Sequence, residues 1–255
     1  MKMTSKIAMT LLMAATLLSC QSNSSKSGNS QKVDISSSGG GEDTYLEMSM
    51  NTKGENIEMA MLQKIYLSHT GKGRVEMYKM NDGKPSLIMI GISDMNKPTQ
   101  SILIDDSAKT YSINKIDTAK SEDNILDKHT TYAVAKVGNE TIQGLNCVHA
   151  QIIKTMKFSG IQSFMNSNDT TDLWMTKDIP MPAAMQSKFA KSMGIAYNND
   201  VANQLLQMDC TGFPVKFQMH SEKSSVISNL TKISHDNFSE SMFEIPKDYK
   251  EIPGF

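Results

Sequence analysis

The sequence has almost no arginine, few aromatic residues and little net charge. Arg74 is the single arginine, tryptophan occurs once, and aromatic residues make up 6% of the chain. The formal net charge is −1, so the remaining lysines leave no basic excess. Arginine is the preferred partner of phosphate groups, because its planar guanidinium donates two parallel hydrogen bonds. We therefore expect no nucleic-acid partner.

The sequence also lacks the short motifs that carry catalysis or hold cofactors. It has no H-E-x-x-H, G-x-S-x-G, phosphate loop, glycine-rich dinucleotide fingerprint or C-x-x-C. The carboxylates fall mostly at turns such as "NDG", "DDS" and "SED", where they cap the local backbone. The histidines are scattered, with no pair four residues apart: His69, His129, His149, His220 and His235. We expect neither an enzyme nor a resident cofactor or metal.

Long apolar runs are absent apart from one near the start, Ile7–Leu18. A bilayer-spanning helix needs about 20 apolar residues, so this run suits the central region of a secretory signal instead. Leu17, Leu18 and Ser19 then precede Cys20 and resemble a bacterial lipobox. In such a motif the thiol accepts a diacylglyceryl group, and the small residue lets the signal peptidase cut before it. An ordinary signal peptide is the alternative.

We expect three segments: a lipoprotein signal at 1–19, a lipidated cysteine with a tether at 20–43, and one domain at 44–255. The tether is rich in serine and glycine and has almost nothing to bury, which is typical of a flexible linker. We expect acyl chains on Cys20, such as palmitate, to attach the protein to its membrane partner. No acidic run follows Cys20, which favours the outer membrane with the domain facing the periplasm.

Alternation of apolar and polar residues dominates the domain and predicts strands. The strand-like runs are "YLEMSM", "IEMAMLQKIYL", "GRVEMYKM", "SLIMIGI", "SILID", "KTYSIN", "TYAVAKV", "LNCVHAQIIK", "TDLWMTKDI", "FPVKFQMHS" and "SSVISNLTKI". Nearly all are joined by short links rich in turn residues, so about eleven strands in an antiparallel meander are predicted.

One segment, at 182–208, has a helical pattern instead. Met185, Phe189 and Met193 recur at i, i+4 and i+8. A second apolar set lies at Val201, Leu205 and Met208. An antiparallel sheet with one apolar face must cover that face, either with a helix or by closing into a barrel. An immunoglobulin-like sandwich is the competing architecture.

Methionine is the one abundant unusual residue, with 21 in the chain. A two-residue turn at 54–55, with glycine first, would be of type II′. It would place Met48 opposite Met61 and Met50 opposite Met59, with four thioethers on one face. Three interpretations remain open: a packed core, an adaptable wall for an apolar ligand, or a soft Cu(I) site. No dense Met/His repeat supports the metal.

Two cysteines remain in the domain, Cys147 and Cys210. In an oxidising compartment they can pair, and closing a loop of about 60 residues would stabilise by roughly 4 kcal/mol. The alternative is two buried thiols that act as small apolar side chains.

Several motifs occur together in a familiar order: "QGLNCVHAQI", "LWMTKDI", "CTGFPVKF" and "FEIPKDYKEI". With a Y-x-x-M strand and a D-x-x-x-K-T-Y turn before them, they resemble domain-of-unknown-function family 4412 of bacterial envelope proteins over most of 44–252. That family is similar in turn to the lipoprotein-sorting proteins LolA and LolB. The resemblance implies a mainly β fold: a single curved antiparallel sheet, or incomplete β-barrel, with the helical insertion closing an apolar cavity. It implies no catalytic residues.

The sequence thus predicts a membrane-anchored envelope lipoprotein that binds an acyl chain or lipid moiety without catalysis. The expected cavity lies between the sheet and the helical insertion. Its candidate residues are Met48, Met50, Met59, Met61, Met185, Phe189 and Met193. The alternative is a structural or interaction module for an envelope partner, with no ligand cavity. The identity of any protein partner stays open.

Overall fold

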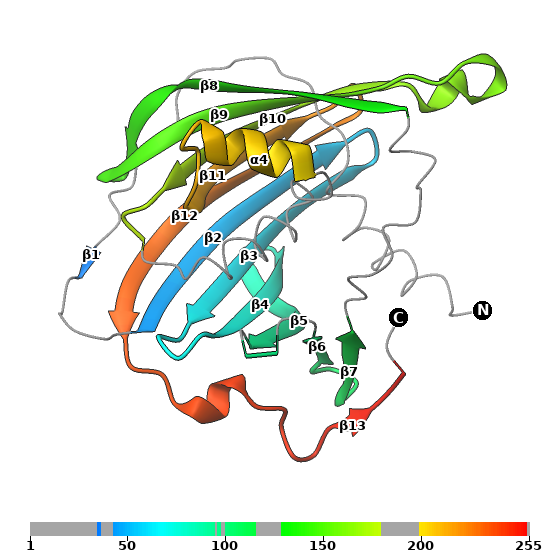
Figure 1. Ribbon diagram of the computed structural model, residues 1–255. Coiled ribbons are helices and arrows are strands. Elements are labelled where there is room, and N and C mark those ends of the chain that lie inside the picture. The colour runs from blue at the N-terminus through cyan, green and yellow to red at the C-terminus, as the bar shows by residue number, and fades with distance from the viewer. Residues whose placement is uncertain are drawn as a thin grey trace. The chain divides into compact units, whose positions relative to one another are not determined.

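The computed structural model describes residues 35–36, 43–94, 96–97, 100–115, 129–179 and 199–253. These residues form two compact units, which are treated separately (Figure 1). The described part of unit 1 comprises 52–58, 129–179 and 199–227. Unit 2 comprises the rest of the described residues.

Thirteen strands form one hydrogen-bonded sheet. They are β1 Ile35–Ser36, β2 Asp43–Gly54, β3 Ile57–Leu67, β4 Lys72–Asn81, β5 Lys84–Asp94, β6 Gln100–Asp105, β7 Thr110–Lys115, β8 Thr130–Ile142, β9 Leu145–Met156, β10 Ser167–Thr176, β11 Phe213–His220, β12 Ser224–Asp236 and β13 Lys250–Glu251. The strand order is β13-β7-β6-β5-β4-β3-β2-β12-β11-β10-β9-β8, with β1 beside β12. Within the described ranges, three helical segments accompany them: η1 Gly160–Met165, α4 Asn199–Gln207 and η3 Glu240–Phe243.

Tight turns set the register of the hairpins. Gln143 and Gly144 both have positive φ, as do Asp82 and Gly83. Two such residues in a row form the type I′ turn, whose twist matches that of paired strands. Ile142 accordingly pairs with Leu145 and leads from β8 into β9.

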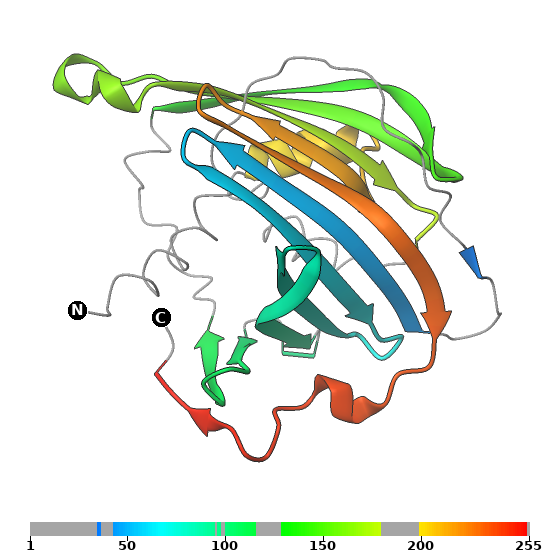
Figure 2. The same ribbon diagram turned by 180° about the vertical axis from the view of Figure 1, so that it is seen from behind.

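In unit 1, α4 lies over one face of the strands β8–β11 (Figure 1, Figure 2). Val201 and Leu205 of α4 are buried, as the helical pattern predicted. Among the strand residues, Ala150, Leu173 and Phe217 are buried too. No helix within the described ranges has the length and apolar character needed to cross a membrane.

In unit 2, the C-terminal segment packs on one face of β4–β7. A core cluster joins Ile90, Ile92 and Ile104 of the sheet to Phe243 of η3. Tyr66, Tyr111, Phe238 and Tyr249 pack against this cluster, among other partly buried residues. The apolar residues of the ending "FEIPKDYKEI" therefore help to fix the chain's last segment to the sheet.

The predicted fold class is confirmed. The chain is mainly β, and without the two-residue strands β1 and β13 the eleven strands β2–β12 remain. The strands form one sheet rather than a two-sheet sandwich. Among the described strands, β8 and β13 each pair on one side only, so the sheet is open rather than a closed barrel.

The predicted turn at 54–55 is wrong by one residue. β2 continues to Gly54, and the turn residues are Glu55 and Asn56. Gly54 sits where a Cβ would lie 3.4 Å from the carbonyl oxygen of Lys223. This is an ordinary van der Waals distance, so the packing at the strand end would accept a Cβ. The glycine does not supply a type II′ turn.

Candidate apolar ligand site on the methionine face

Methionines gather on one face of β3, β4 and β5 in unit 2. Met77 pairs with Gln63 on one side and with Met89 on the other. Met61 lies two residues before Gln63, and residues two apart on a strand share a face. Met61, Met77 and Met89 therefore point to the same side of the sheet.

The methionines of β2 share this side as well. Tyr45 of β2 contacts Tyr66 of β3, with ring centroids 5.0 Å apart. Odd-numbered residues of β2 and even-numbered residues of β3 therefore share the opposite face. We call the other side the methionine face; it carries Met48, Met50, Met59, Met61, Met77 and Met89.

The methionine face is only partly covered. Met48 is 1% exposed, and Ile65 on the same face is fully buried. The side chains of Met50, Met59, Met61, Met77 and Met89 are half-buried. Five unbranched thioether side chains thus stand partly open to solvent over neighbouring strands.

The sequence pattern identified four of these six residues. Met77 could have been assigned from alternation in "GRVEMYKM" once its partner strand was known. Met89 could not, because the register between β4 and β5 shifts beyond Met77. There Tyr78 pairs with Leu87, which leaves Ile88 without a partner in the ladder and changes which residues of β5 face which side.

The opposite face of unit 2 carries the only arginine. Arg74 lies 2.7 Å from Glu76, and both side chains are largely buried. Tyr78 donates to the same carboxylate at 2.7 Å, and Tyr66 approaches it at 3.4 Å. Burial, together with the negative charge of Glu76, raises the pKa of Tyr66 to about 12. Arg74 also donates to the backbone carbonyl of Met242 at 2.9 Å.

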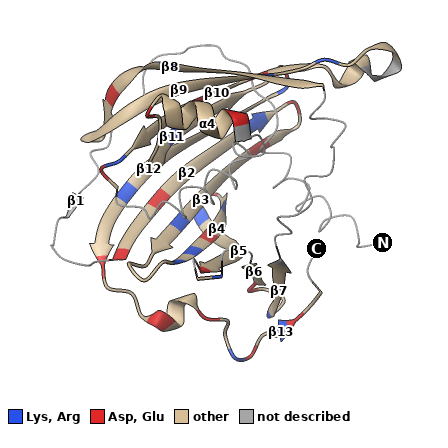
Figure 3. Cartoon of the chain, in the orientation of Figure 1, with Lys and Arg blue, Asp and Glu red and all other residues tan. Residues whose placement is uncertain are grey.

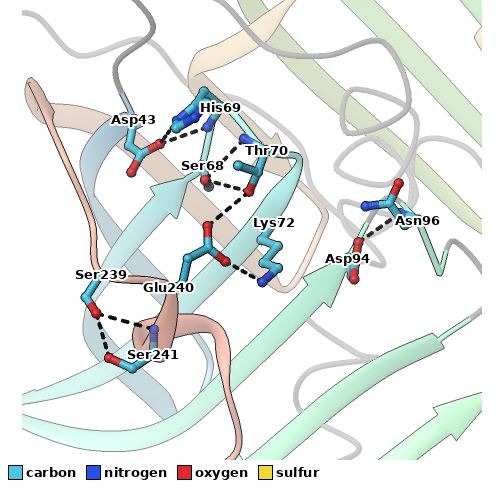
Figure 4. A network of polar contacts seen from close by, with 10 residues as sticks. All are labelled: Asp43, Ser68, His69, Thr70, Lys72, Asp94, Asn96, Ser239, Glu240 and Ser241. Atoms are coloured by element: carbon cyan, nitrogen blue, oxygen red, sulfur yellow. Dashed lines mark hydrogen bonds and ion pairs between the residues drawn. The ribbon is translucent and has the colours of Figure 1, made fainter.

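The segment that Arg74 binds is the C-terminal strap, residues 238–252. Glu240 of the strap accepts hydrogen bonds from Lys72 and, at 3.4 Å, from Thr70 (Figure 4). Further along the strap, the backbone amide of Ile252 donates to the backbone carbonyl of Tyr111 at 2.8 Å. The polar groups on this face therefore bind the C-terminal strap.

Asp43, at the start of β2, binds the first residue of the strap. Its carboxylate accepts from the backbone amides of His69 at 2.9 Å and Phe238 at 2.7 Å. The ring of His69 lies 2.7 Å from the same carboxylate (Figure 4). Burial alone would raise the pKa of Asp43, but these hydrogen bonds outweigh it and hold the pKa below its usual range.

Four residues predicted for the site lie outside the described residues. They are Cys20 of the lipobox and Met185, Phe189 and Met193 of the helical insertion. The predicted cavity between sheet and insertion therefore rests on the sheet residues alone. Two surface cavities of about 590 and 370 Å³ lie in unit 1, and neither is lined by a candidate methionine.

Cys147 and Cys210 are free in the structure and both are buried. The thiol of Cys147 donates to the carbonyl of Leu145 at 3.5 Å, and that of Cys210 to Met208 at 3.6 Å. This is the arrangement of two buried thiols, the second of the two alternatives. Burial raises the pKa of the Cys147 thiol to about 11.

The single tryptophan of the chain lies in a polar group on unit 1. The ring of His149 stacks on Trp174 at 4.2 Å, and the ammonium of Lys216 lies 3.9 Å from its centroid. His149 in turn lies 2.8 Å from Asp172 and 3.4 Å from Glu140. Neighbouring strands thus place an imidazole ring and an ammonium group against one indole. Among the described residues, no group of three or more His, Cys, Asp or Glu side chains is arranged to hold a metal ion.

Solved structures match this chain over most of its length at low identity. Lipoprotein LppX of Mycobacterium tuberculosis has a TM-score of 0.31 and 9% identity, covering 73% of this chain and 84% of its own. A LolA superfamily protein from Nitrosomonas europaea has a TM-score of 0.34 and 6% identity, covering 80% and 90%. The complex of MucA and MucB from Pseudomonas aeruginosa has a TM-score of 0.38 and 10% identity, covering 82% and 58%.

A sequence comparison with curated proteins gives no match. A family model does match, and it spans residues 46–249, which is most of the chain. These residues contain the motifs from "QGLNCVHAQI" to "CTGFPVKF" and most of the ending "FEIPKDYKEI". The chain belongs to the domain-of-unknown-function family DUF4412.

Proposed function

We propose that the protein is an envelope lipoprotein, tethered through Cys20, that binds an acyl chain or lipid moiety on its methionine face without catalysis. The outer membrane is the proposed site of the anchor, with the domain facing the periplasm. The observation that carries the binding proposal is the set of five half-buried methionines on adjacent strands.

The side chains on this face suit a flexible apolar ligand. Methionine is unbranched and polarizable, so a row of methionines adapts to varied apolar shapes. Each methylene of a ligand that leaves water contributes roughly 0.8 kcal/mol. A chain lying across several methionines can therefore reach useful affinity without polar contacts, and most ligand sites are lined mainly by apolar groups.

The two faces of unit 2 differ in the chemistry of their side chains. Glu76 and the strap are the partners of the charged and phenolic groups near Arg74. That arrangement keeps these charges off the methionine face. Lys79 of β4 pairs with Met61, so this exposed lysine does lie on the methionine face. The predominance of methionine still supports an apolar binding surface rather than a reactive centre.

A double substitution tests the proposal. Gln has nearly the length of Met but an amide in place of the thioether, so Met59→Gln with Met77→Gln should weaken acyl binding. We expect a loss of about tenfold in affinity, from roughly 1–1.5 kcal/mol of lost apolar burial. The measurement is titration with a fluorescent fatty-acyl probe at micromolar concentration.

Met80→Gln is the matched control. Met80 lies on β4 like Met77, but three residues further along, and so points to the opposite face. Its variant should bind the probe as the parent does. Native mass spectrometry of protein from its own envelope adds a second measurement, since it reports both a bound lipid and the acyl mass on Cys20. If no lipid co-purifies and no probe binds, the binding proposal fails.

A structural or interaction module is the second candidate. The full burial of Ile65 and near-full burial of Met48 favour it, because part of the methionine face is already packed. Under this alternative the Met59/Met77 double variant would lose stability rather than probe affinity. A stoichiometric envelope protein bound to the parent would support it.

A further inference from the structure

The hairpin of β9 and β10 in unit 1 ends in the most exposed large apolar residue described. The two strands run on into η1, which lies at the far end of the hairpin (Figure 1, Figure 2). Phe164 of η1 is 80% exposed, whereas Phe158, six residues earlier, is 6% exposed. Single exposed apolar residues are common on protein surfaces, so the position of Phe164 at the tip, and not its exposure alone, carries the argument.

Phe164 is held out by an ordered neck. The backbone amide of Phe158 donates to the side chain of Asn166 at 2.5 Å. The amide of Lys157 donates to His129 at 2.9 Å, and the ring of His129 packs on Phe158 at 4.5 Å. These contacts fix both sides of the tip, so the exposure of Phe164 is built into the hairpin.

Charged residues are absent from the sequence of the hairpin tip and begin at its neck. Residues 158–168 contain no charged side chain, and the described part of η1 is drawn in tan in Figure 3. Lys157, which is exposed, stands at the neck. The hairpin therefore has an uncharged end that carries Phe164, and a neck that carries Lys157 and Glu222. An uncharged end with charged groups behind it matches the order of groups met on entering a lipid surface from water.

A polar cavity of about 590 Å³ lies at the same neck. It is lined by Thr155, Met156, Lys157, Phe158, Asn166, Ser167, Asn168 and Glu222. Lys157 and Glu222 offer one cation and one anion, which match the phosphate and ammonium of a zwitterionic headgroup. The cavity stands where headgroups would lie if the tip reached the acyl region.

We propose that the tip of this hairpin, with Phe164 at its end, inserts into the surface of a lipid bilayer as a second contact beside the anchor on Cys20. The inference rests on the anchored state proposed above, but not on ligand binding by the methionine face. Phenylalanine is among the side chains that bury at the boundary between headgroups and acyl chains. A single such residue adds weak affinity, so the tip orients a molecule that the anchor already holds.

The test uses the full lipoprotein reconstituted in vesicles of equimolar phosphatidylethanolamine and phosphatidylglycerol with brominated acyl chains. The Phe164→Trp variant adds an indole at the tip, and the buried native Trp174 gives a constant background. We expect bromine to quench the added emission at least twofold. Leu206→Trp, on α4 and 66% exposed, is the matched control and should stay unquenched.

A second measurement does not depend on tryptophan. The thiol of a Phe164→Cys variant should react with a membrane-impermeant maleimide about tenfold more slowly in vesicles than in detergent. Leu206→Cys should react equally in both, and the native Cys147 and Cys210 are buried. Equal quenching or equal labelling at positions 164 and 206 overturns the proposal. Binding of the acyl probe is measured in a separate experiment. If the probe does not bind, ligand binding by the methionine face fails, and the proposal for the hairpin tip is unaffected.

Discussion

At the scale of single residues, Gly212 shows why a motif position is fixed. It lies in "CTGFPVKF" with φ +119°, a conformation that other residues rarely adopt. A Cβ added there would stand 2.1 Å from the carbonyl oxygen of Thr176 on β10. The glycine therefore lets the chain pass directly against the strand as it enters β11.

Gly212→Ala should lower the free energy of unfolding by more than about 2 kcal/mol, since it adds both backbone strain and a clash with main-chain atoms. Gly138→Ala is the control: no atom lies within 4 Å of its added Cβ, and its φ is not positive. Urea denaturation of the two variants gives the comparison. Similar stabilities would contradict the packing argument.

Cys147 makes a prediction about alkaline pH. Burial raises the pKa of its thiol to about 11 in the folded chain, above the ordinary value of 9.0. The folded state therefore keeps a proton that the unfolded state loses, and stability falls as pH rises from 9 towards 11. The loss should approach roughly 2 kcal/mol at pH 11.

Denaturation of the parent and of Cys147→Ala at pH 8 and pH 10.5 measures this effect. The parent should lose more stability over the interval than the variant. Parallel losses would show that other groups, such as the partly buried tyrosines, account for the whole dependence.

At the scale of elements, the strap is held at both ends by polar contacts that the sequence did not reveal. Asp43 and Phe238 are 195 residues apart. No spacing rule connects positions so distant, whereas alternation and turns within strands follow from neighbouring residues. Strands, the helical stripe at Val201 and Leu205, and four methionines were therefore predictable from the sequence. The strap, the Arg74 cluster and Met89 were not.

Asp43→Asn should loosen the strap. The variant keeps the shape of the side chain but loses the charge that the amides of His69 and Phe238 bind. We expect a destabilisation of about 1–3 kcal/mol at pH 7. Because the pKa of Asp43 is lowered on folding, its contribution is present above the ordinary value and disappears as pH falls through the lowered one.

Denaturation at pH 7 and pH 3 checks both parts of this prediction. The gap between parent and Asp43→Asn should narrow at pH 3. Glu58→Gln removes a carboxylate that is 76% exposed, and should change stability little at either pH. A gap that stays constant with pH would assign the effect of Asp43 to shape rather than charge.

At the scale of the whole molecule, the order of the eleven strands β2–β12 in the sheet follows the chain on either side of one junction. From β2 to β7, and again from β8 to β12, each strand neighbours the next in sequence. Among the strands β2–β12 the exception is β2 beside β12, at opposite ends of the domain. The two-residue strands β1 and β13 pair in parallel with β12 and β7. Local hydrophobic patterns describe the two runs well, and this is why the sequence predicted a meander. They contain no information on how the runs join.

That junction bears on how the chain reaches its native state. Pairing of β2 with β12 requires closure of a loop that includes nearly the whole domain, and such long-range pairing is slow to form. For a chain exported with its N-terminus leading, as proposed, β2 leaves the translocation channel early and its partner leaves almost last. During that interval one edge of a long, methionine-bearing strand has no partner, and exposed edges of this kind recruit other chains. For an exported chain, the final stage of folding, rather than the finished fold, is thus where we expect protection from other chains to matter most.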